Sequence, residues 1–248
     1  MYICIMIFIT GGTGLVGSHI LLKLSIQQRD FIALKRNSSS LSVCRNIFSN
    51  YNSTHLFEKI KWIDGDINDV SRLKDAMAGC KYIIHCAAIV SFHHSDLQLM
   101  HKINIEGTAN VMNLALDSGI KKCVYISSVA TLGYEPNTVI DETSYFKHQN
   151  NNSNYAITKY YAEQEVWRAS AEGLKVVIVN PSIILGPGNW NKGSSKIFKK
   201  IYDGLRFYSQ GGSGYVDVVD VADAVVKLLF SNIHNERFIL NSVNLSYR

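Results

Sequence analysis

The sequence lacks several features that define large classes of proteins. Its 248 residues include only 3 prolines, and no internal repeat is visible, which excludes a fibrous or largely disordered chain. The five cysteines form no Cys-x-x-Cys pair, a pattern that argues against a zinc site or a disulfide framework and favours a reducing compartment. No bound metal is therefore expected.

Membranes and nucleic acids are also disfavoured as partners. No apolar stretch reaches the 18 residues that a membrane-spanning helix needs, and the apolar start "MYICIMIFITGG" has no basic leader. The net charge of +5 is mild and is not gathered into a block or a stripe. We expect a cytoplasmic protein that binds neither a membrane nor a nucleic acid.

The remaining pattern is that of a globular protein built from alternating strands and helices. Hydrophobic residues make up 47% of the chain, enough for a sizeable core. Short apolar runs predict strands within residues 2–9, 31–36, 59–67, 81–88, 122–128 and 174–182, and helical spacing predicts helices near residues 14–28, 70–78, 97–117 and 155–172. Segment 37–58 is interpreted as a surface loop, with room for a short helix. This order predicts an α/β fold with a doubly wound parallel sheet, whose ligands bind at the carboxyl ends of the strands.

A glycine-rich turn closes the first strand and opens the first helix. The stretch "FITGGTGLVGSHI" (8–20) contains Gly-x-Gly-x-x-Gly, which lets backbone N–H groups and a helix N-terminus approach a diphosphate. The expected contacts with a dinucleotide here are Gly11, Thr13, Gly14, Leu15, Val16 and Gly17.

The end of the second strand predicts which dinucleotide is bound. NAD sites usually carry an acid there, but residues 33–38 read "ALKRNS" and have none. Arg36, helped by Lys35 and Ser38, suits a 2′-phosphate, so NADP(H) is favoured and NAD(H) stays possible. Alternatively, Lys35 and Arg36 are ordinary solvated residues. Asp66, with Ile67 beside it, either accepts a hydrogen bond from adenine or caps a turn.

The motifs taken together resemble the extended short-chain dehydrogenases/reductases, the superfamily of NAD-dependent epimerases and dehydratases. The resemblance covers residues 3 to about 230, and its end looks most like the dihydroflavonol 4-reductase branch. The motifs that carry it, in order along the chain, are "TGGTGLVG", "DGDI", "HCAA", "NIEGTANVMNLA", "VYISS", "YAITK" and "NPSIILGPG".

The resemblance implies a Ser-Tyr-Lys active site. Tyr155 would be the acid/base, with its pKa lowered from about 10 by the ammonium of Lys159, four residues on along one helical face. Lys159 would also hold the nicotinamide ribose. Ser128 would polarise the substrate oxygen, with Ser127 or Thr131 as fallbacks. Asn104 would support the site or serve the structure alone.

The resemblance extends to the rest of the chain. Family members continue beyond residue 248, so we expect a dinucleotide-binding Rossmann domain at 1–180 and a small, truncated substrate lobe at 181–248, interleaved with the sheet. Asp220 is expected to cap a helix within 214–230. The helices near 97–117 and 155–172 would pair in a homodimer. Further cofactor contacts are expected from Ala87, Ala88, Pro181 and Ile183.

The function that this pattern favours is an NADP(H)-dependent oxidoreductase, which reduces a ketone or aldehyde or oxidises a secondary alcohol. The open alternatives are a nucleotide-sugar epimerase with bound NAD and a non-catalytic dinucleotide-binding sensor or assembly protein. Leu132 and Gly133 stand where sugar-nucleotide dehydratases carry an acidic pair, which argues against water elimination. Two interpretations stay open for several further side chains. The aromatic residues Trp190, Tyr134 and Tyr208 either line a substrate pocket or pack within the lobe. His93 and His94 either contact the substrate or are solvated loop residues.

Overall fold

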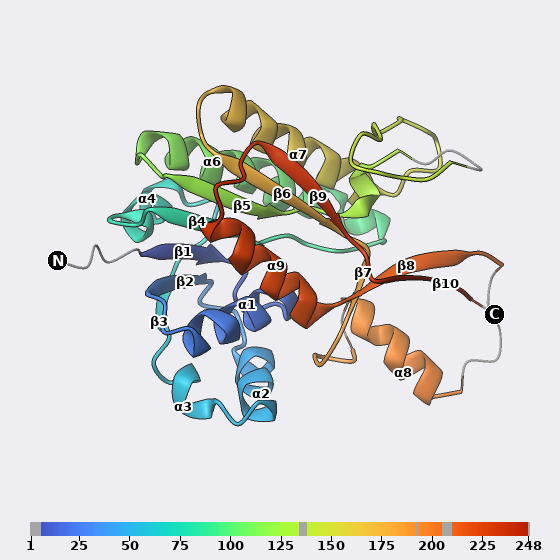
Figure 1. The fold of residues 1–248 in the computed structure, drawn as a ribbon, viewed down its shortest axis with the longest axis horizontal. Coiled ribbons are helices and arrows are strands. Elements are labelled where there is room, and N and C mark those ends of the chain that lie inside the picture. Colours follow the sequence, from blue (N-terminus) through green and yellow to red (C-terminus); the bar gives the residue numbers. More distant parts are fainter. Residues whose placement is uncertain (1–5, 134–137, 192, 205–209, 248) are drawn as a thin grey trace.

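The computed structural model describes residues 6–133, 138–191, 193–204 and 210–247, and its core is a seven-stranded parallel sheet (Figure 1). The strand order is β3-β2-β1-β4-β5-β6-β9, the order of a Rossmann fold with one strand added at the β6 edge. The strands span Ile7–Thr10 (β1), Phe31–Lys35 (β2), Lys61–Asp64 (β3), Tyr82–His85 (β4), Lys122–Ile126 (β5), Val176–Pro181 (β6) and Glu236–Leu240 (β9).

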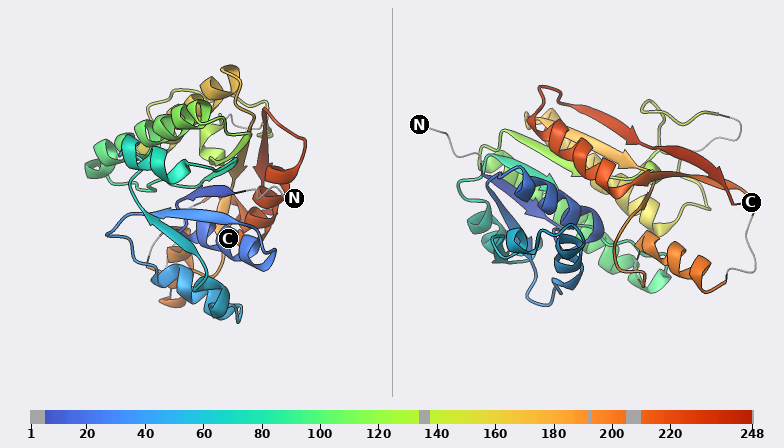
Figure 2. Two further views of the ribbon diagram at one scale, coloured as in Figure 1. Left: turned by 90° about the vertical axis from the view of Figure 1, so that its left-hand side faces the viewer. Right: turned by 60° about the horizontal axis from the view of Figure 1, so that its bottom comes forward.

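Helices cover both faces of this sheet, because its central strands are apolar on both sides. Ile7 and Ile9 enter one core and Phe8 enters the other, as the alternation of side chains along a strand requires. The right-hand view of Figure 2 shows α9 beside α1 on one face. That face carries α1 (Leu15–Ile26), α2 (Ser42–Asn50), α3 (Thr54–Phe57) and α9 (Val218–Phe230), and the other carries α4 (Val70–Met77), α5 (Leu97–Met100), α6 (Gly107–Asp117) and α7 (Asn154–Ala171).

A π-helical segment, η2 (His101–Glu106), joins α5 to α6. The predicted helix near 97–117 is therefore one helical stretch whose middle has a wider turn. Such insertions are frequent at functional sites, because they turn side chains away from the regular register. Here the segment carries Asn104.

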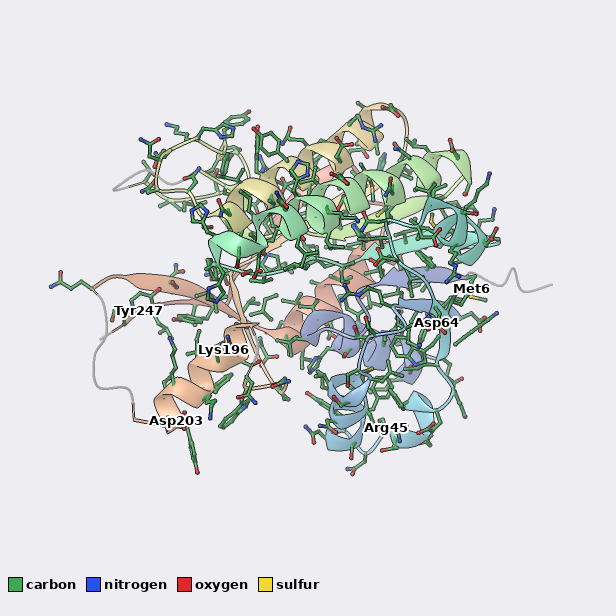
Figure 3. The ribbon with its side chains drawn as sticks, turned by 180° about the vertical axis from the view of Figure 1, so that it is seen from behind. Met6, Arg45, Asp64, Lys196, Asp203 and Tyr247 are labelled. Atoms are coloured by element: carbon green, nitrogen blue, oxygen red, sulfur yellow. The ribbon has the colours of Figure 1, made fainter. Side chains whose placement is uncertain are left out.

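A second, three-stranded sheet extends beyond the carboxyl ends of the main strands. Its order is β10-β8-β7, formed by Ile183–Leu185 (β7), Gly212–Asp217 (β8) and Val243–Ser246 (β10). In Figure 3, Tyr247 at the end of this sheet and α8 (Lys196–Tyr202) lie at the opposite end of the molecule from Met6. Segment 181–248 thus contributes both to this sheet and, through α9 and β9, to the main layers. The division of the chain at residue 180 stays a prediction.

Two expectations about local structure are wrong. Segment 37–58 is not mainly a loop: it holds α2 and α3, whose apolar residues Ile47 and Phe48 are buried against α1. The N-cap of α9 is Asp217, whose carboxylate accepts from Val219 N at 2.7 Å, whereas Asp220 lies in the first turn. Residues 2–5 of the first predicted strand lie outside the described residues.

Within the described ranges, no helix combines the length and apolar character that crossing a membrane demands.

Candidate active site

The glycine turn is shaped by backbone approaches that leave no room for side chains. Gly11 has φ +73°, and a Cβ there would lie 2.6 Å from Ala87 N. A Cβ on Gly17 would lie 2.2 Å from Gly11 O. Gly14 N donates to Gly11 O at 3.0 Å, and α1 begins directly after Gly14. The turn therefore places backbone groups and the N-terminus of α1 at the carboxyl end of β1, which lies between β2 and β4 in the sheet.

A cavity of ≈ 170 Å³ lies over this turn. The turn forms one part of its wall, and the rest comes from the ends of β2, β3 and β4 and from Ile103 of η2. It is lined by Thr10, Gly11, Thr13, Gly14, Leu34, Lys35, Arg36, Ser39, Gly65, Asp66, Ile67, Cys86, Ala87, Ala88, Ile89 and Ile103.

Eight of the fifteen predicted cofactor contacts line this cavity, and seven do not: Gly17, Tyr155 and Lys159, together with Leu15, Val16, Pro181 and Ile183. Leu15 lies against the 188 loop, since a Cβ on Gly188 would sit 2.8 Å from its Cδ1, and Val16 packs on the core. Pro181 ends β6 and Ile183 starts β7, away from this cavity. The cofactor contacts of these residues stay predictions.

The end of β2 presents one free cation to the cavity. Lys35 forms an ion pair with Asp64, so its charge is compensated within the protein. Arg36 makes no ion pair with any described residue and lines the cavity. Ser39, rather than the expected Ser38, joins it there. The structure offers a guanidinium and a hydroxyl at this end of the cavity.

Asp66 combines the two interpretations that its sequence left open. Its Oδ1 accepts from Asn68 N at 2.9 Å and from Asn68 Nδ2 at 3.0 Å, which is an aspartate-stabilised turn. It also lines the cavity, beside Ile67. A turn that fixes one carboxylate oxygen orients the other.

Ser128 and Tyr155 face each other at the carboxyl end of β5. The Tyr155 phenol interacts with the Ser128 hydroxyl, which accepts from Ala130 N at 3.1 Å. The fallback hydroxyls are engaged elsewhere: Ser127 Oγ donates to Glu163 at 2.5 Å and Thr131 Oγ1 at 2.8 Å. Of the three hydroxyls, Ser128 is therefore the one placed to act together with Tyr155.

One expectation about the phenol is wrong. Burial raises the pKa of Tyr155 above its ordinary value, and the hydrogen bond from Ser128 only partly opposes this. Lys159 does not lower the pKa, because its ammonium is directed away from Tyr155, toward β5.

Lys159 is 1% exposed and is fixed by two hydrogen bonds. Its Nζ donates to Tyr125 Oη at 2.6 Å and to Ile126 O at 2.8 Å. Burial lowers the pKa of Lys159 to about 7, and the charge of Glu163 acts in the opposite direction. The ammonium is thus held under the end of β5, one helical turn from Tyr155.

Asn104 connects the loop after β4 with α7. Its Oδ1 accepts from Ile89 N at 2.7 Å, and its Nδ2 donates to Ile89 O at 3.0 Å and to Thr158 Oγ1 at 3.2 Å. These bonds fix the segment that lines the cavity relative to the helix that carries Tyr155.

Two residues near the site were missed by sequence reasoning. Glu163 is 1% exposed and follows Lys159 by four residues, a spacing that places both on one helical face. Phe92 is 76% exposed and its ring lies edge-on to Tyr155, with centroids 6.2 Å apart. An aromatic residue in the loop after the fourth strand was a signal available in the sequence.

The remaining candidates lie away from Tyr155 or outside the description. Trp190 stacks on Phe198 of α8, with centroids 6.2 Å apart, so it packs within the second lobe. His93 and His94 are exposed, and no cluster of three metal-ligating side chains occurs among the residues that the structure describes. Tyr134 and Tyr208 lie outside those residues.

A nicotinamide dinucleotide fits these surroundings. A Cβ on Gly11 or Gly17 would meet protein backbone, so these glycines keep the turn tight, and the helix N-terminus supplies positive potential for a diphosphate. Arg36 and Asp66 line the cavity where an adenosine half would lie, and Ser128 and Tyr155 lie at the end of β5, which β4 separates from β1.

The fold and this cavity define a Rossmann-type protein. A model of the NAD dependent epimerase/dehydratase family matches residues 7–240, and the chain belongs to that family.

Relatives of this chain include named reductases. It is 34% identical over 220 residues to a putative dihydroflavonol 4-reductase of Synechocystis, a match that covers 87% of this chain and 60% of the relative. It is 30% identical over 182 residues to cinnamoyl-CoA reductase 1 of Petunia hybrida, a match that covers 69% of this chain and 54% of the relative. The chain therefore spans little more than half the length of these curated relatives.

Solved structures show the same fold. The crystal structure of gox2253 has a TM-score of 0.84 at 30% identity and covers 98% of this chain and 71% of that one. Gre2 from Candida albicans, in complex with NADPH, has a TM-score of 0.80 at 21% identity, and the match covers 98% of this chain and 79% of Gre2.

Proposed function

We propose that this protein is an NADP(H)-dependent oxidoreductase that interconverts a ketone or aldehyde with the corresponding alcohol. The observation that carries the proposal is the pairing of Ser128 and Tyr155 at the carboxyl end of β5, the same edge of the sheet that carries the glycine turn. Two hydroxyls at one point suit a substrate oxygen that accepts a hydrogen bond and then a proton.

The chain's own residues supply the proton and the orientation. When bound, the dinucleotide gives or receives the hydride. Ser128 donates a hydrogen bond to the carbonyl oxygen, and Tyr155 passes its phenolic proton to the same oxygen as negative charge develops there. The raised pKa of Tyr155 keeps the phenol protonated at neutral pH, which suits the direction of carbonyl reduction. Lys159, one helical turn from Tyr155, would hold the nicotinamide ribose, and the ring of Phe92 packs edge-on against the phenol.

NADP(H) is the proposed form of the cofactor, and the end of β2 supports it. Arg36 has no carboxylate partner among the residues that the structure describes, and Ser39 lies beside it in the cavity wall. The acid nearest this end, Asp64, is neutralised by Lys35. A 2′-phosphate would meet a guanidinium and a hydroxyl there, whereas NAD would leave the guanidinium without an anion.

A homodimer through α5 and α7 is also proposed. These helices pack together, and they leave Leu97, Leu99 and Tyr161 38–49% exposed. A second copy would cover these side chains. Light scattering after size exclusion tests the proposal: a dimer that becomes a monomer in Leu99→Glu supports it, and a monomeric wild-type protein contradicts it.

The function is tested by following NADPH and NADH oxidation with a panel of ketones and aldehydes. We expect reduction with NADPH as the better donor. Tightly bound NAD in the purified protein, together with turnover of a nucleotide sugar, would instead identify an epimerase. Binding of NADPH without turnover of any carbonyl compound would instead identify a non-catalytic dinucleotide-binding protein.

A further inference from the structure

A second tyrosine, on β5, holds the ammonium of Lys159. Tyr125 is 1% exposed, and its Oη lies 2.6 Å from Lys159 Nζ. The same ammonium lies 4.2 Å from the centroid of the Tyr125 ring. An ammonium has no lone pair, so it must be the donor in this bond, and Tyr125 supplies it with both an oxygen and a ring face.

The bond continues as a buried chain across three further elements. The Tyr125 phenol interacts with the Thr108 hydroxyl of α6, and Thr108 Oγ1 lies 3.0 Å from His85 Nε2. His85 Nδ1 lies 2.6 Å from Thr10 Oγ1, at the end of β1, where Thr10 also accepts from Ala87 N at 3.2 Å. Because the ammonium occupies one lone pair of the Tyr125 oxygen, the phenolic proton is free to point at Thr108.

Donation of hydrogen bonds in one direction, from Tyr125 toward Thr10, satisfies the polar groups of this chain. Tyr125 donates to Thr108, Thr108 donates to His85 Nε2, and the Nδ1–H tautomer of His85 donates to Thr10. Burial lowers the pKa of His85 to about 3, so the ring is neutral and can accept at one nitrogen while donating at the other. Aligned donors polarise one another, which strengthens the bond that the first oxygen accepts.

We propose that Tyr125 is a positioning residue for Lys159, which holds the ammonium charged and fixed beneath the active site through the chain Tyr125–Thr108–His85–Thr10. The expected change in kinetics rests on the proposed function, whereas the expected change in the titration of Lys159 does not. Tyr125 does not line the cavity, and among the described residues it makes no hydrogen bond to Tyr155, so it acts through Lys159. The chain ends at Thr10, from which the glycine turn departs, so it joins both halves of the site.

The groups that face Lys159 decide the sign of the effect. Glu163 on α7 and Cys86 after β4 favour the ammonium, whereas burial opposes it and lowers the pKa of Lys159 to about 7. His85 on β4 is neutral, and Tyr155 lies one turn away on α7. Removing the Tyr125 hydroxyl takes away an acceptor of the ammonium and leaves the desolvation in place, so the pKa of Lys159 must fall further.

The test compares Tyr125→Phe, which keeps the ring, with Tyr125→Leu, which loses it, and with Tyr82→Phe as control. Tyr82 is on the neighbouring strand β4, and its ring packs at a tilt against Phe230 of α9, with centroids 5.9 Å apart. The readout is the pH titration of the Lys159 ¹³Cε signal in lysine-labelled protein without dinucleotide, assigned by its loss in Lys159→Met. We expect the midpoint to fall by about 1 pH unit in Tyr125→Phe, further in Tyr125→Leu, and not at all in Tyr82→Phe.

Kinetics supply the second readout. A midpoint that falls from about 7 by about 1 unit leaves roughly fivefold fewer molecules with charged Lys159 at pH 7. The alkaline limb of kcat/KM for NADPH, which reports groups of the free enzyme, should move to lower pH by the same amount, and the loss should vanish well below the lower midpoint. A merely structural role would lower the rate equally at every pH.

An unchanged Lys159 midpoint in Tyr125→Phe would overturn the inference. If Tyr125→Phe does not fold, Thr108→Val takes its place: it removes the acceptor of the Tyr125 proton without touching Lys159, and a smaller shift in the same direction is expected, with no shift contradicting the inference. A wild-type protein that reduces no carbonyl compound would refute the proposed function alone, because the titration needs no turnover.

Discussion

Arg237 of β9 donates from Nη1 to Oε1 of Glu163 in α7 at 3.2 Å, so the outermost strand of the main sheet is bound to the helix that carries the proposed active site. The two side chains are 17% and 2% exposed. The same guanidinium also donates to the carbonyl oxygens of Glu142 and Ser144, which fixes the loop before α7 against β9.

Replacing Arg237 by Met should lower the free energy of unfolding by about 3 kcal/mol, because Glu163 would stay buried without its cationic partner. Urea denaturation measures the change. The matched control is Arg168→Met on the same helix, which breaks exposed pairs with Glu165 and Glu172 and should cost about 1 kcal/mol or less. Equal losses of unfolding free energy in the two variants would show that the buried Arg237–Glu163 pair stabilises the protein no more than the pairs of Arg168 do.

Replacing Tyr155 by Phe should reduce kcat for carbonyl reduction by about 10²- to 10⁴-fold, the range attributed to a positioned acid. Binding of NADPH, measured by its fluorescence, and the melting temperature should change little. The control Tyr161→Phe removes a phenol from the same helix at an exposed position and should retain the rate. A Tyr155→Phe variant with full activity would remove this residue from the mechanism.

Replacing Arg36 by Ala should raise the Kd of NADPH by about 10- to 100-fold and leave that of NADH nearly unchanged, because a charge-assisted bond to a 2′-phosphate is lost. Isothermal calorimetry with both dinucleotides gives the ratio. The control Arg45→Ala removes a comparable charge from α2, where it is paired with exposed Glu58. If Arg36→Ala weakened NADH as much as NADPH, the 2′-phosphate would not be the group that Arg36 meets.

Replacing Gly17 by Ala should destabilise the protein by about 1–3 kcal/mol and abolish NADPH binding, since the new Cβ would displace Gly11 O in the turn. The control is Gly119→Ala, where φ is +63° but nothing lies within 4 Å of the added Cβ. That variant should lose about 1 kcal/mol through backbone strain alone and bind NADPH normally. Normal binding by Gly17→Ala would contradict the close approach at this turn.

The buried His85 should make stability depend on pH. Its folded pKa of about 3 lies below the ordinary value of 6.5, so the unfolded chain takes up the proton first. The stability that neutral His85 contributes is complete above pH 6.5 and is lost as pH falls toward 3, by about 1.4 kcal/mol per unit. The difference in unfolding free energy between wild type and His85→Gln should therefore shrink over that range. A constant difference for His85→Gln would mean that the ring is not held neutral.

Much of the fold was predictable, because buried parallel strands are apolar on both faces and stand out between amphipathic helices. The strand of residues 176–181 and the helix of residues 154–171 show this plainly. The last strand of the main sheet was not predicted: β9 is a short run at the sheet edge, and its last four residues are only half-buried. α2 was also missed, because its apolar face is confined to Cys44, Ile47 and Phe48 amid serines and asparagines.

The site was predictable where its members are close in sequence or follow a fixed spacing. The glycine turn and the placement of Tyr155 near the end of the fifth strand came from such patterns. The partners of Lys159 did not, because its orientation depends on a tyrosine 34 residues away and on the depth at which α7 packs. The buried setting of Glu163 likewise depends on Asn180 and Arg237, which reach it from β6 and β9.

The pairing of β9 with β6 has a consequence for how the chain acquires its structure during synthesis. β6 emerges from the ribosome with its outer edge unpaired, and the residues that cover that edge, 236–240, follow only about sixty residues later. Until then a run of valines and an isoleucine offers free backbone groups to any neighbouring nascent chain. Translation speed across residues 182–235, and the chaperones that meet the chain in that interval, should therefore govern the yield of soluble protein more than the final thermodynamic stability does.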